Sequence, residues 1–442
     1  MNKIYLQSLG CSKNLVDSEN MLGLLKNKGY EIVEFADKAD YIIINTCSFI
    51  NDAKEESINS IIEAAELKGS NDITIIVTGC LAQRYSDDLL KEIPEIDILI
   101  GTHGYEKIDK IIEEHQKEKQ KVISVEIDET IVEDLPRELL TPKYYAFLKI
   151  SEGCSNHCTY CVIPKIRGKY RSRKIEDIVN EARILSKQGV KELIVIAQDT
   201  SKYGLDLYGE RQLHKLIGEL SKIEGIKWIR VHYLYPEDLY HELIMEFKAN
   251  DKLLKYFDIP LQHISDDVLK RMNRKTNKEQ ITNLIKKIRK EIPEAVIRTS
   301  LITGFPGETE EDHEMLKEFL KEYKLDRVGV FKYSREENTA AYKLKNQIKE
   351  EIKEARQEEL MKIQQEISFN NNTAKIGKTY DVIIDEDSGD NEYLGRTYMD
   401  SPEIDGCVFV NSNVKLNVGE IYKVSIVDAL EYDLIGDIGG LN

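Results

Sequence analysis

Three cysteines lie close together in the segment SEGCSNHCTYCVIP, as Cys154, Cys158 and Cys161. The spacing C-x3-C-x2-C suits thiolates that approach different irons of one iron–sulfur cube from a single short loop. Three ligands leave one iron without a protein ligand, and an open coordination position allows a metal centre to bind and activate a small molecule. The pattern predicts a reactive iron–sulfur cluster.

Zinc is the alternative metal for the same thiols, with His157 as a further ligand. Structural zinc usually takes four protein ligands, often from paired C-x2-C knuckles, and the sequence lacks such a pair. The segment also follows directly on the apolar run AFLKIS, at the place where a barrel strand would end. Both observations favour the cluster.

A second set of cysteines, Cys11, Cys47 and Cys80, is widely separated, but each follows an expected strand, in IYLQSLGC, YIIINTC and IIVTGC. The carboxyl ends of parallel strands meet at one edge of a sheet, where ligands bind. Helix N-termini at the same edge favour an anionic centre. We therefore expect a second cluster there, against the alternative of three core cysteines. Cys407 lies in a β-like run without a partner, and we expect it to pack in a core.

The elements that must position these cysteines follow from hydrophobic patterning, which predicts an α/β protein. Residues 3–118 alternate apolar runs with amphipathic stretches, which indicates a doubly wound parallel sheet. Residues 143–340 contain six strand candidates with intervening helices, which predicts an open (β/α)6 barrel. Residues 343–372 have helical spacing. Five short β-like runs after residue 372 indicate a small antiparallel β-barrel of the oligonucleotide-binding or a related type.

Further polar residues and glycines follow the expected barrel strands, at the face where barrel enzymes bind their ligands. Glycines there let a cofactor approach the backbone. Tyr233 and Tyr235 follow the third strand, and the basic segment PKIRGKYRSR would steer a carboxylate or phosphate unless it is a solvated face. The predicted cofactor-binding residues are Gln198, Asp199, Gln262, His263, Thr303, Gly304 and Gly307.

Charge and composition restrict the partners. The 442 residues include 62 Lys and Arg against 79 Asp and Glu, a net charge of −17. Residues 373–442 alone carry five basic and fourteen acidic side chains, a net charge of −9. Proteins that hold nucleic acid through its phosphates carry basic surfaces, so nucleic-acid binding is not indicated. The sequence has neither a secretory signal nor an apolar run of membrane-spanning length, so we expect a cytoplasmic protein with reduced thiols.

The two sets of cysteines together resemble the methylthiotransferase family of the radical S-adenosylmethionine superfamily, from end to end. The resemblance implies a methylthiotransferase N-terminal domain at 2–118, a linker at 119–139, a radical core at 140–370 and a TRAM barrel at 372–441. The segments SLGCSKNLVDSE, NTCSFINDAKEESINSI, HYLYP, IPLQHISDDVLKRMNR and DRVGVFKYSREENT are similar to the RimO branch, which modifies a ribosomal protein.

The resemblance also implies the chemistry. Cys154, Cys158 and Cys161 would hold a [4Fe–4S] cluster that binds S-adenosylmethionine, and Cys11, Cys47 and Cys80 a second [4Fe–4S] cluster that carries the sulfur. An unactivated C–H bond is beyond general acid–base catalysis, so a cofactor radical would abstract the hydrogen. A second S-adenosylmethionine would donate the methyl group. The substrate would be the β-carbon of an aspartate in the basic small-subunit ribosomal protein twelve, and the reductant a flavodoxin or ferredoxin type of protein.

Two other functions remain open. The same machinery would serve methylthiolation of a tRNA adenosine, but a tRNA-binding barrel is expected to be basic, whereas an acidic one suits a basic protein. A non-catalytic iron–sulfur protein of ribosome assembly or redox chemistry would bind clusters as well. It would not need an open iron beside cofactor-binding loops.

Overall fold

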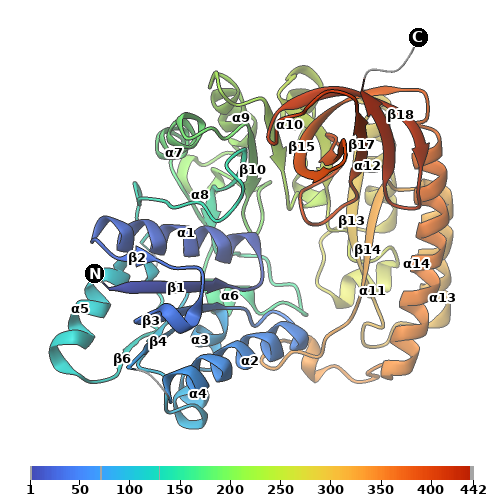
Figure 1. Cartoon of the computed structure of the whole chain (residues 1–442). Coiled ribbons are helices and arrows are strands. Elements are labelled where there is room, and N and C mark those ends of the chain that lie inside the picture. Colours follow the sequence, from blue (N-terminus) through green and yellow to red (C-terminus); the bar gives the residue numbers. More distant parts are fainter. Residues whose placement is uncertain (1, 70–71, 129, 439–442) are drawn as a thin grey trace.

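The computed structural model describes residues 2–69, 72–128 and 130–438. Three parts follow one another along the chain (Figure 1). The N-terminal part is a six-stranded parallel sheet of order β2-β1-β3-β4-β5-β6, with helices on both faces. This confirms the predicted doubly wound α/β architecture. Its strands are β1 (Lys3–Ser8), β2 (Glu31–Ile32), β3 (Tyr41–Thr46), β4 (Thr74–Gly79), β5 (Ile98–Ile100) and β6 (Val122–Ser124).

The helices of the N-terminal part cover the sheet through two separate apolar clusters. One cluster joins α1 and α5 to one face of the sheet, and the other joins α2, α3 and α4 to the opposite face. Because both faces are covered, the strands are almost entirely apolar. The helices are α1 (Ser12–Asn27), α2 (Asn51–Lys68), α3 (Cys80–Arg84), α4 (Ser86–Glu92) and α5 (Ile108–Glu118), with short 3-10 helices η1 (Ala36–Lys38) and η2 (Tyr105–Lys107).

The middle part is an open half-barrel of six parallel strands in the order β14-β13-β12-β11-β10-β7, as predicted. Helices pack on its outer face. The strands are β7 (Tyr145–Lys149), β10 (Glu192–Ile196), β11 (Trp228–Val231), β12 (Leu253–Asp258), β13 (Val296–Thr303) and β14 (Arg327–Lys332), and a small ladder joins β8 (Ser151–Glu152) to β9 (Arg171–Ser172). The helices are α6 (Ile163–Arg167), α7 (Ile175–Lys187), α8 (Leu205–Tyr208), α9 (Leu213–Ser221), α10 (His241–Ala249), α11 (Asp266–Arg271), α12 (Lys278–Glu291) and α13 (Glu310–Tyr323), with η3 (Pro236–Asp238) and η4 (Ala341–Lys343).

The C-terminal part is a closed five-stranded barrel, reached through the long helix α14 (Glu350–Thr373) at the predicted helical segment (Figure 1). The strand order is β15-β16-β17-β19-β18, and every pair is antiparallel except β17 with β19. This confirms the small β-barrel. Its strands are β15 (Thr379–Gly389), β16 (Glu392–Arg396), β17 (Val408–Ser412), β18 (Ile421–Ala429) and β19 (Leu434–Ile438).

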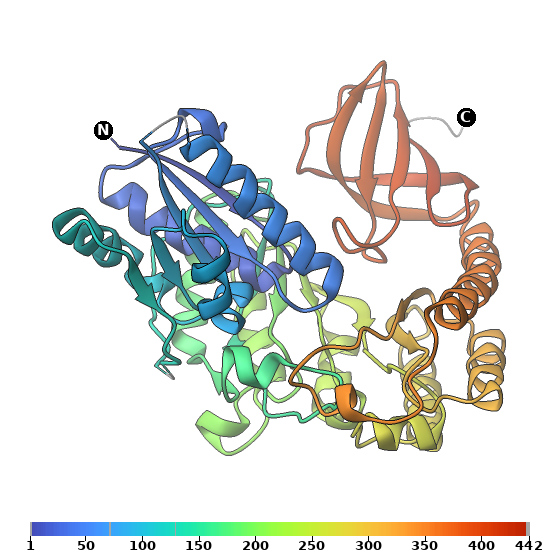
Figure 2. The ribbon, with the colours of Figure 1, turned by 90° about the horizontal axis from the view of Figure 1, so that it is seen from below.

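The C-terminal barrel packs against the inner face of the half-barrel. Side chains alternate along a strand, so Ala146 and Leu148 of β7 face the outer helices while Tyr145 and Phe147 share an apolar cluster with the C-terminal strands. A buried ion pair stands in this interface, where Glu192 accepts hydrogen bonds from Arg230 and from Arg396 of β16. The N-terminal sheet and the C-terminal barrel thus both lie against the middle part (Figure 2).

The segment between the first two parts contains one element that the sequence did not reveal. Strand β6 lies within the expected linker 119–139 and pairs with β5, so the sheet extends into that range. Residues 70–71, 129 and 439–441 of the expected domains lie outside the described residues. Among the described residues no helix is long and apolar enough to cross a membrane.

Candidate iron–sulfur site

The loop of Cys154, Cys158 and Cys161 follows the β7–β8 segment and precedes α6, at the carboxyl end of the first barrel strand. Cys154 accepts a hydrogen bond from the Asn156 backbone N–H at 3.4 Å, and Arg274 donates to the Cys158 thiol at 3.9 Å. Burial raises the pKa of Cys154 to about 11 and raises that of Cys161, and the charge of Cys158 raises both further. Neighbouring thiols that interact in this way lie together in one short loop, as predicted.

The structure also brings together Cys11, Cys47 and Cys80, from three strand ends of the N-terminal sheet. Cys11 directly precedes α1, Cys80 begins α3, and Cys47 stands in the loop before α2. A Cβ atom on Gly10 would lie only 2.8 Å from the Cys47 Sγ, so Gly10 (φ +86°) lets the first loop approach the second. This confirms the geometric argument that the strand ends converge.

The thiols of this second set differ in their electrostatics. Burial raises the pKa of Cys80 to about 12, and burial together with the charge of Cys11 raises that of Cys47. Burial also opposes ionisation of Cys11, but the charges of Lys13 and Arg167 lower its pKa below the ordinary thiol value. Two fixed cations beside three thiols provide a positive environment that suits an anionic centre such as an iron–sulfur cluster.

One cysteine of the second set packs at the interface between the first two parts. Cys80 shares an apolar cluster with Val162 and Ile166, which follow Cys161 in the sequence. A buried network of charges continues this contact. Arg167 binds Asp17 of α1 and Glu152, which ends β8 directly before the loop of Cys154, Cys158 and Cys161, here called the radical loop. The N-terminal thiol set therefore lies against α6, the helix that follows Cys161.

The donor chemistry of both sites fits iron–sulfur clusters. Among the described residues, no group of three His, Cys, Asp or Glu side chains stands close enough together for a single metal ion. Thiolates that bind separate irons of a cube do not need to converge on one point, whereas the ligands of zinc do. Each site offers three largely buried thiols with a basic side chain beside them.

Two of the predicted cofactor-binding residues lie beside the radical loop. Asp199 is fully buried and accepts a hydrogen bond from the Asn156 side chain at 2.8 Å. Burial raises the pKa of Asp199, although Lys202 opposes the shift. Gln198 donates to Glu152 at 3.1 Å, and its Oε1 atom is buried without a hydrogen-bond partner. Both side chains therefore lie next to the segment that carries Cys154, Cys158 and Cys161.

The other five predicted residues form a separate group beside α14. Thr303 donates to Glu308, which in turn binds Arg356 of α14. A Cβ atom on Gly304 would lie 2.3 Å from Lys353, so the missing side chain of Gly304 makes room for α14. The remaining members are Gln262, whose backbone bridges to β13, Gly307, whose carbonyl accepts from Arg271, and the buried His263.

His263 is neutral at physiological pH. Burial, with Arg271, lowers the pKa of its imidazole to about 3, and its Nδ1 atom accepts a hydrogen bond from the Ser265 backbone. The Nε2 atom has no hydrogen-bond partner and lies 3.8 Å from the Glu308 carboxylate. In this structure the group around His263 supports the loop between β13 and α13.

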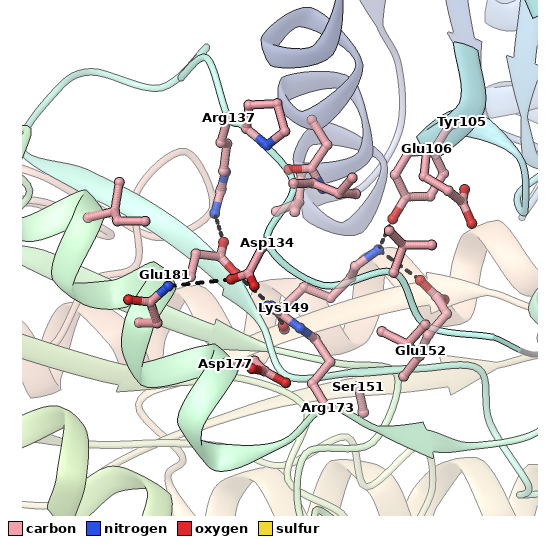
Figure 3. Close-up of a pocket in the computed structure, with 18 of the residues that line it drawn as sticks. Tyr105, Glu106, Asp134, Arg137, Lys149, Ser151, Glu152, Arg173, Asp177 and Glu181 are labelled. Atoms are coloured by element: carbon pink, nitrogen blue, oxygen red, sulfur yellow. Dashed lines mark hydrogen bonds and ion pairs between the residues drawn. The ribbon is translucent and has the colours of Figure 1, made fainter. Parts of the chain in front are cut away.

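A cavity of about 450 Å³, lined by both apolar and charged side chains, lies between α1, the expected linker and α7 (Figure 3). None of the six cysteines lines it. Its labelled basic side chains point toward carboxylates: Arg137 and Arg173 both bind Glu181, and Lys149 binds Glu152. The basic segment PKIRGKYRSR is therefore not a solvated face throughout, because Arg167 and Arg173 are committed to protein carboxylates.

Sequence reasoning missed several side chains that contact the thiols. Lys13, Asn14 and Arg274 lie in segments that resemble the family, but they were not singled out as site residues, although Asn14 and Lys13 lie within three residues of Cys11. The guanidinium of Arg274 stacks 4.4 Å from the Tyr235 ring centroid, beside Cys158. A signal was available for Lys13 and Asn14, because both stand in the first turn of the helix that directly follows Cys11.

Replacing Gly153 with alanine should damage the radical loop. Gly153 has φ +73°, and a Cβ atom there would stand 2.1 Å from the Lys169 carbonyl oxygen. Left-handed strain costs about 1–3 kcal/mol, and the backbone overlap adds to it. We expect a lower melting temperature and loss of iron after reconstitution. Gly209→Ala is the matched control, with φ +78° and open space around it. Equal iron loss in both variants would contradict the argument.

Comparison with known proteins follows the same three parts. Three families match the chain: "Uncharacterized protein family UPF0004" at residues 3–101, "Radical SAM superfamily" at 148–320 and "TRAM domain" at 376–438. The chain is 57% identical over 439 residues to the ribosomal protein uS12 methylthiotransferase RimO of Clostridioides difficile (strain 630), covering 99% of each chain. The chain belongs to the RimO methylthiotransferase family. The RimO protein of Thermoanaerobacter sp. (strain X514) is 54% identical over 437 residues, 99% of this chain and 100% of that one.

Solved structures agree at the level of the fold. The radical S-adenosylmethionine methyltransferase TsrM of Kitasatospora setae superposes with a TM-score of 0.56 at 13% identity, covering 75% of this chain and 73% of that one. The cobalamin-dependent enzyme OxsB gives a TM-score of 0.53, covering 77% of this chain and 54% of that one. The family confirms the expected radical S-adenosylmethionine methylthiotransferase, with an iron–sulfur centre and S-adenosylmethionine as cofactor.

Proposed function

We propose that this chain transfers a methylthio group to the β-carbon of an aspartate in ribosomal protein uS12, using two [4Fe–4S] clusters and two S-adenosylmethionine molecules. The observation that supports the proposal is the packing of Cys80, from the N-terminal thiol set, on Val162 and Ile166, which follow Cys161 in the sequence. The names of the most similar relatives supply the substrate.

The two sites have different roles in the proposed reaction. The proposed ligands are Cys154, Cys158 and Cys161 for the radical cluster, and Cys11, Cys47 and Cys80 for the auxiliary cluster. The bound cofactor supplies a carbon-centred radical able to abstract an unactivated hydrogen. We assign Gln198 and Asp199 to holding the cofactor, since both lie beside the radical loop. The buried cations Lys13 and Arg167 favour an anionic sulfur-carrying cluster in the N-terminal part.

The substrate contact belongs, in our proposal, to a limited part of the acidic C-terminal barrel. Several of its carboxylates are already used inside the molecule, as Asp400 binds Arg327 and Asp405 binds the Tyr256 hydroxyl. The β15–β16 hairpin is different, because residues 386–392 contain no Lys or Arg and its acidic side chains are exposed. These are Glu386, Asp387, Asp390 and Glu392.

Neutralising that hairpin should weaken the substrate complex. We expect the variant with Glu386→Gln, Asp387→Asn, Asp390→Asn and Glu392→Gln to bind basic uS12 roughly 10-fold more weakly at low salt, with a smaller salt dependence. Binding is measured by titration at several ionic strengths. The control neutralises four exposed carboxylates of α2, namely Glu55, Glu56, Glu63 and Glu66. Equal loss in the control would show that overall charge, not the hairpin, attracts uS12.

The remaining expectations follow from this assignment. A flavodoxin or ferredoxin type of protein would supply electrons, and the reaction would take place in the cytoplasm, where uS12 is made. We retain the domain boundaries 2–118, 140–370 and 372–441 as part of the proposal, with β6 as an extension of the first domain into the linker.

Mass spectrometry tests the function directly. Ribosomal proteins and tRNA nucleosides are compared between a strain that lacks the gene and its parent. Loss of a methylthio group from uS12 alone supports the proposal. Loss from tRNA alone would replace it with the tRNA alternative, and loss from neither would favour a non-catalytic iron–sulfur protein.

A further inference from the structure

Arg167 is buried between the N-terminal and middle parts, and its partners adjoin both sets of cysteines. Its side chain is 1% exposed, yet it lies at the C-terminal end of α6, six residues after Cys161. One guanidinium nitrogen donates to both carboxylate oxygens of Glu152, at 3.1 and 3.0 Å. The other donates to Asp17 at 3.0 Å and to the Asn14 Oδ1 atom at 2.6 Å. One side chain therefore joins the radical loop to α1 of the N-terminal part.

The partner of Arg167 on the N-terminal side contacts all three loops of the second thiol set. The Asn14 amide donates to the carbonyl of Leu9, at 3.1 Å, and to that of Thr46, at 2.8 Å. These carbonyls lie two residues before Cys11 and one residue before Cys47. The Asn14 Oδ1 atom also accepts from the Cys80 thiol at 3.8 Å. Asn14 is fully buried, and it holds the three loops in one arrangement.

The partner on the other side is equally close to the radical loop. Glu152 precedes Gly153 and Cys154, and its carboxylate accepts from the Gly153 backbone N–H at 3.1 Å. Lys149 adds a second cation that binds both Glu152 and Asp17 (Figure 3 shows Lys149 and Glu152). The charges of this network are balanced pair by pair, which a buried ionic cluster requires.

We propose that Arg167 is the positioning residue of the auxiliary site: its fork holds the thiol-bearing loops of the N-terminal part against the radical loop and keeps a positive charge beside the auxiliary cluster. The inference rests on the proposed function, because it assumes a second cluster at Cys11, Cys47 and Cys80. Arginine suits this position, since its planar guanidinium makes hydrogen bonds in two directions from one rigid group. Lysine would keep the charge without the fork.

Spectroscopy of the reconstituted, reduced protein tests the proposal. We compare the spin–spin interaction of the two clusters by electron paramagnetic resonance in the parent, Arg167→Lys and Asn14→Ala. Both variants should retain two clusters by iron analysis, yet show a weaker spin–spin interaction between the clusters than the parent does. Arg167→Gln should also shift the midpoint potential of the auxiliary cluster to more negative values, because the adjacent positive charge is lost. Methylthiolation should fall roughly 10- to 100-fold in each.

Arg137→Lys is the matched control. Arg137 is also buried and also binds two carboxylates from different parts, Glu19 of α1 and Glu181 of α7, but it contacts no cysteine. Its variant should leave the spectrum unchanged. An unchanged interaction in Arg167→Lys, or an equal change in Arg137→Lys, would overturn the inference while the two-cluster assignment stands. A parent protein that contains iron for only one cluster would instead refute the proposed function.

Discussion

Replacement of Cys47 by alanine is expected to abolish methylthiolation while S-adenosylmethionine is still cleaved. Cys47 belongs to the N-terminal thiol set, and its backbone is held on both sides by the Ser57 hydroxyl, so the loop should keep its shape. A cluster that loses one of three protein ligands is not retained, and about half of the iron and sulfide should disappear. Iron and sulfide analysis, with assays of 5′-deoxyadenosine and of modified uS12, measures the effect.

Cys154→Ala should remove the other cluster and abolish S-adenosylmethionine cleavage as well. The radical cluster would be lost, so neither 5′-deoxyadenosine nor product should form, although a similar amount of iron remains. Cys407→Ser provides the control, because Cys407 lies in the C-terminal barrel beside Asp433, away from both sets. Unchanged metal content in Cys47→Ala would refute the second cluster, and iron loss in Cys407→Ser would show that the assay reports folding instead of ligation.

The convergence of Cys11, Cys47 and Cys80 was predictable because it follows from topology. Parallel strands end at one edge, so residues that follow different strands meet there whatever their separation in the sequence. The six barrel strands were predictable for a different reason, because their apolar runs alternate with helical patterns. Strand β6 was not predicted, because three residues within a charged segment have no detectable hydrophobic period. Their pairing with β5 decides their conformation.

The roles of individual charges were not predictable in the same way. Arg167 and Arg173 stand in one basic segment, and nothing in their spacing shows that the first binds α1 and the second binds Glu133 and Glu181. Gly304 lies in a segment that suits cofactor binding, but Lys353, 49 residues later, occupies the space beside it. These contacts depend on which distant elements pack together.

The acidic C-terminal barrel shows how composition misleads when burial is unknown. Its net charge of −9 suggested one continuous surface for a basic protein. The structure assigns part of that charge to internal pairs, with Asp400 and Asp405 buried against the half-barrel. Among the exposed carboxylates, those of the β15–β16 hairpin form a group without a neighbouring Lys or Arg in the sequence, which is why we assign the uS12 contact to it; the others are Asp381, Glu403, Glu420, Asp428 and Glu431.

Glu192→Gln is expected to destabilise the protein by about 3–5 kcal/mol and to loosen the C-terminal barrel. Glu192 is fully buried between Arg230 and Arg396, and its loss leaves Arg230 without a carboxylate and Arg396 with Asp385 alone. Breaking a buried pair costs this much because desolvation is no longer offset. Thermal unfolding and limited proteolysis near α14 measure the two effects. Glu420→Gln is the control, since its ion pair with Lys191 joins the same two parts but is exposed, and should contribute less than about 1 kcal/mol.

The pH dependence of unfolding separates this charge effect from lost packing. Burial opposes ionisation of Glu192, but Arg396 and Arg230 lower its pKa below the ordinary carboxyl value. A carboxyl whose pKa is lowered in the folded state contributes stability above its unfolded pKa, roughly 4.3, and loses that contribution as pH falls through the folded value. The difference in unfolding free energy between the parent and Glu192→Gln should therefore be constant from pH 8 to about 5 and shrink below roughly pH 4. A difference that stays constant in acid would mean that Glu192 contributes through shape and not through charge.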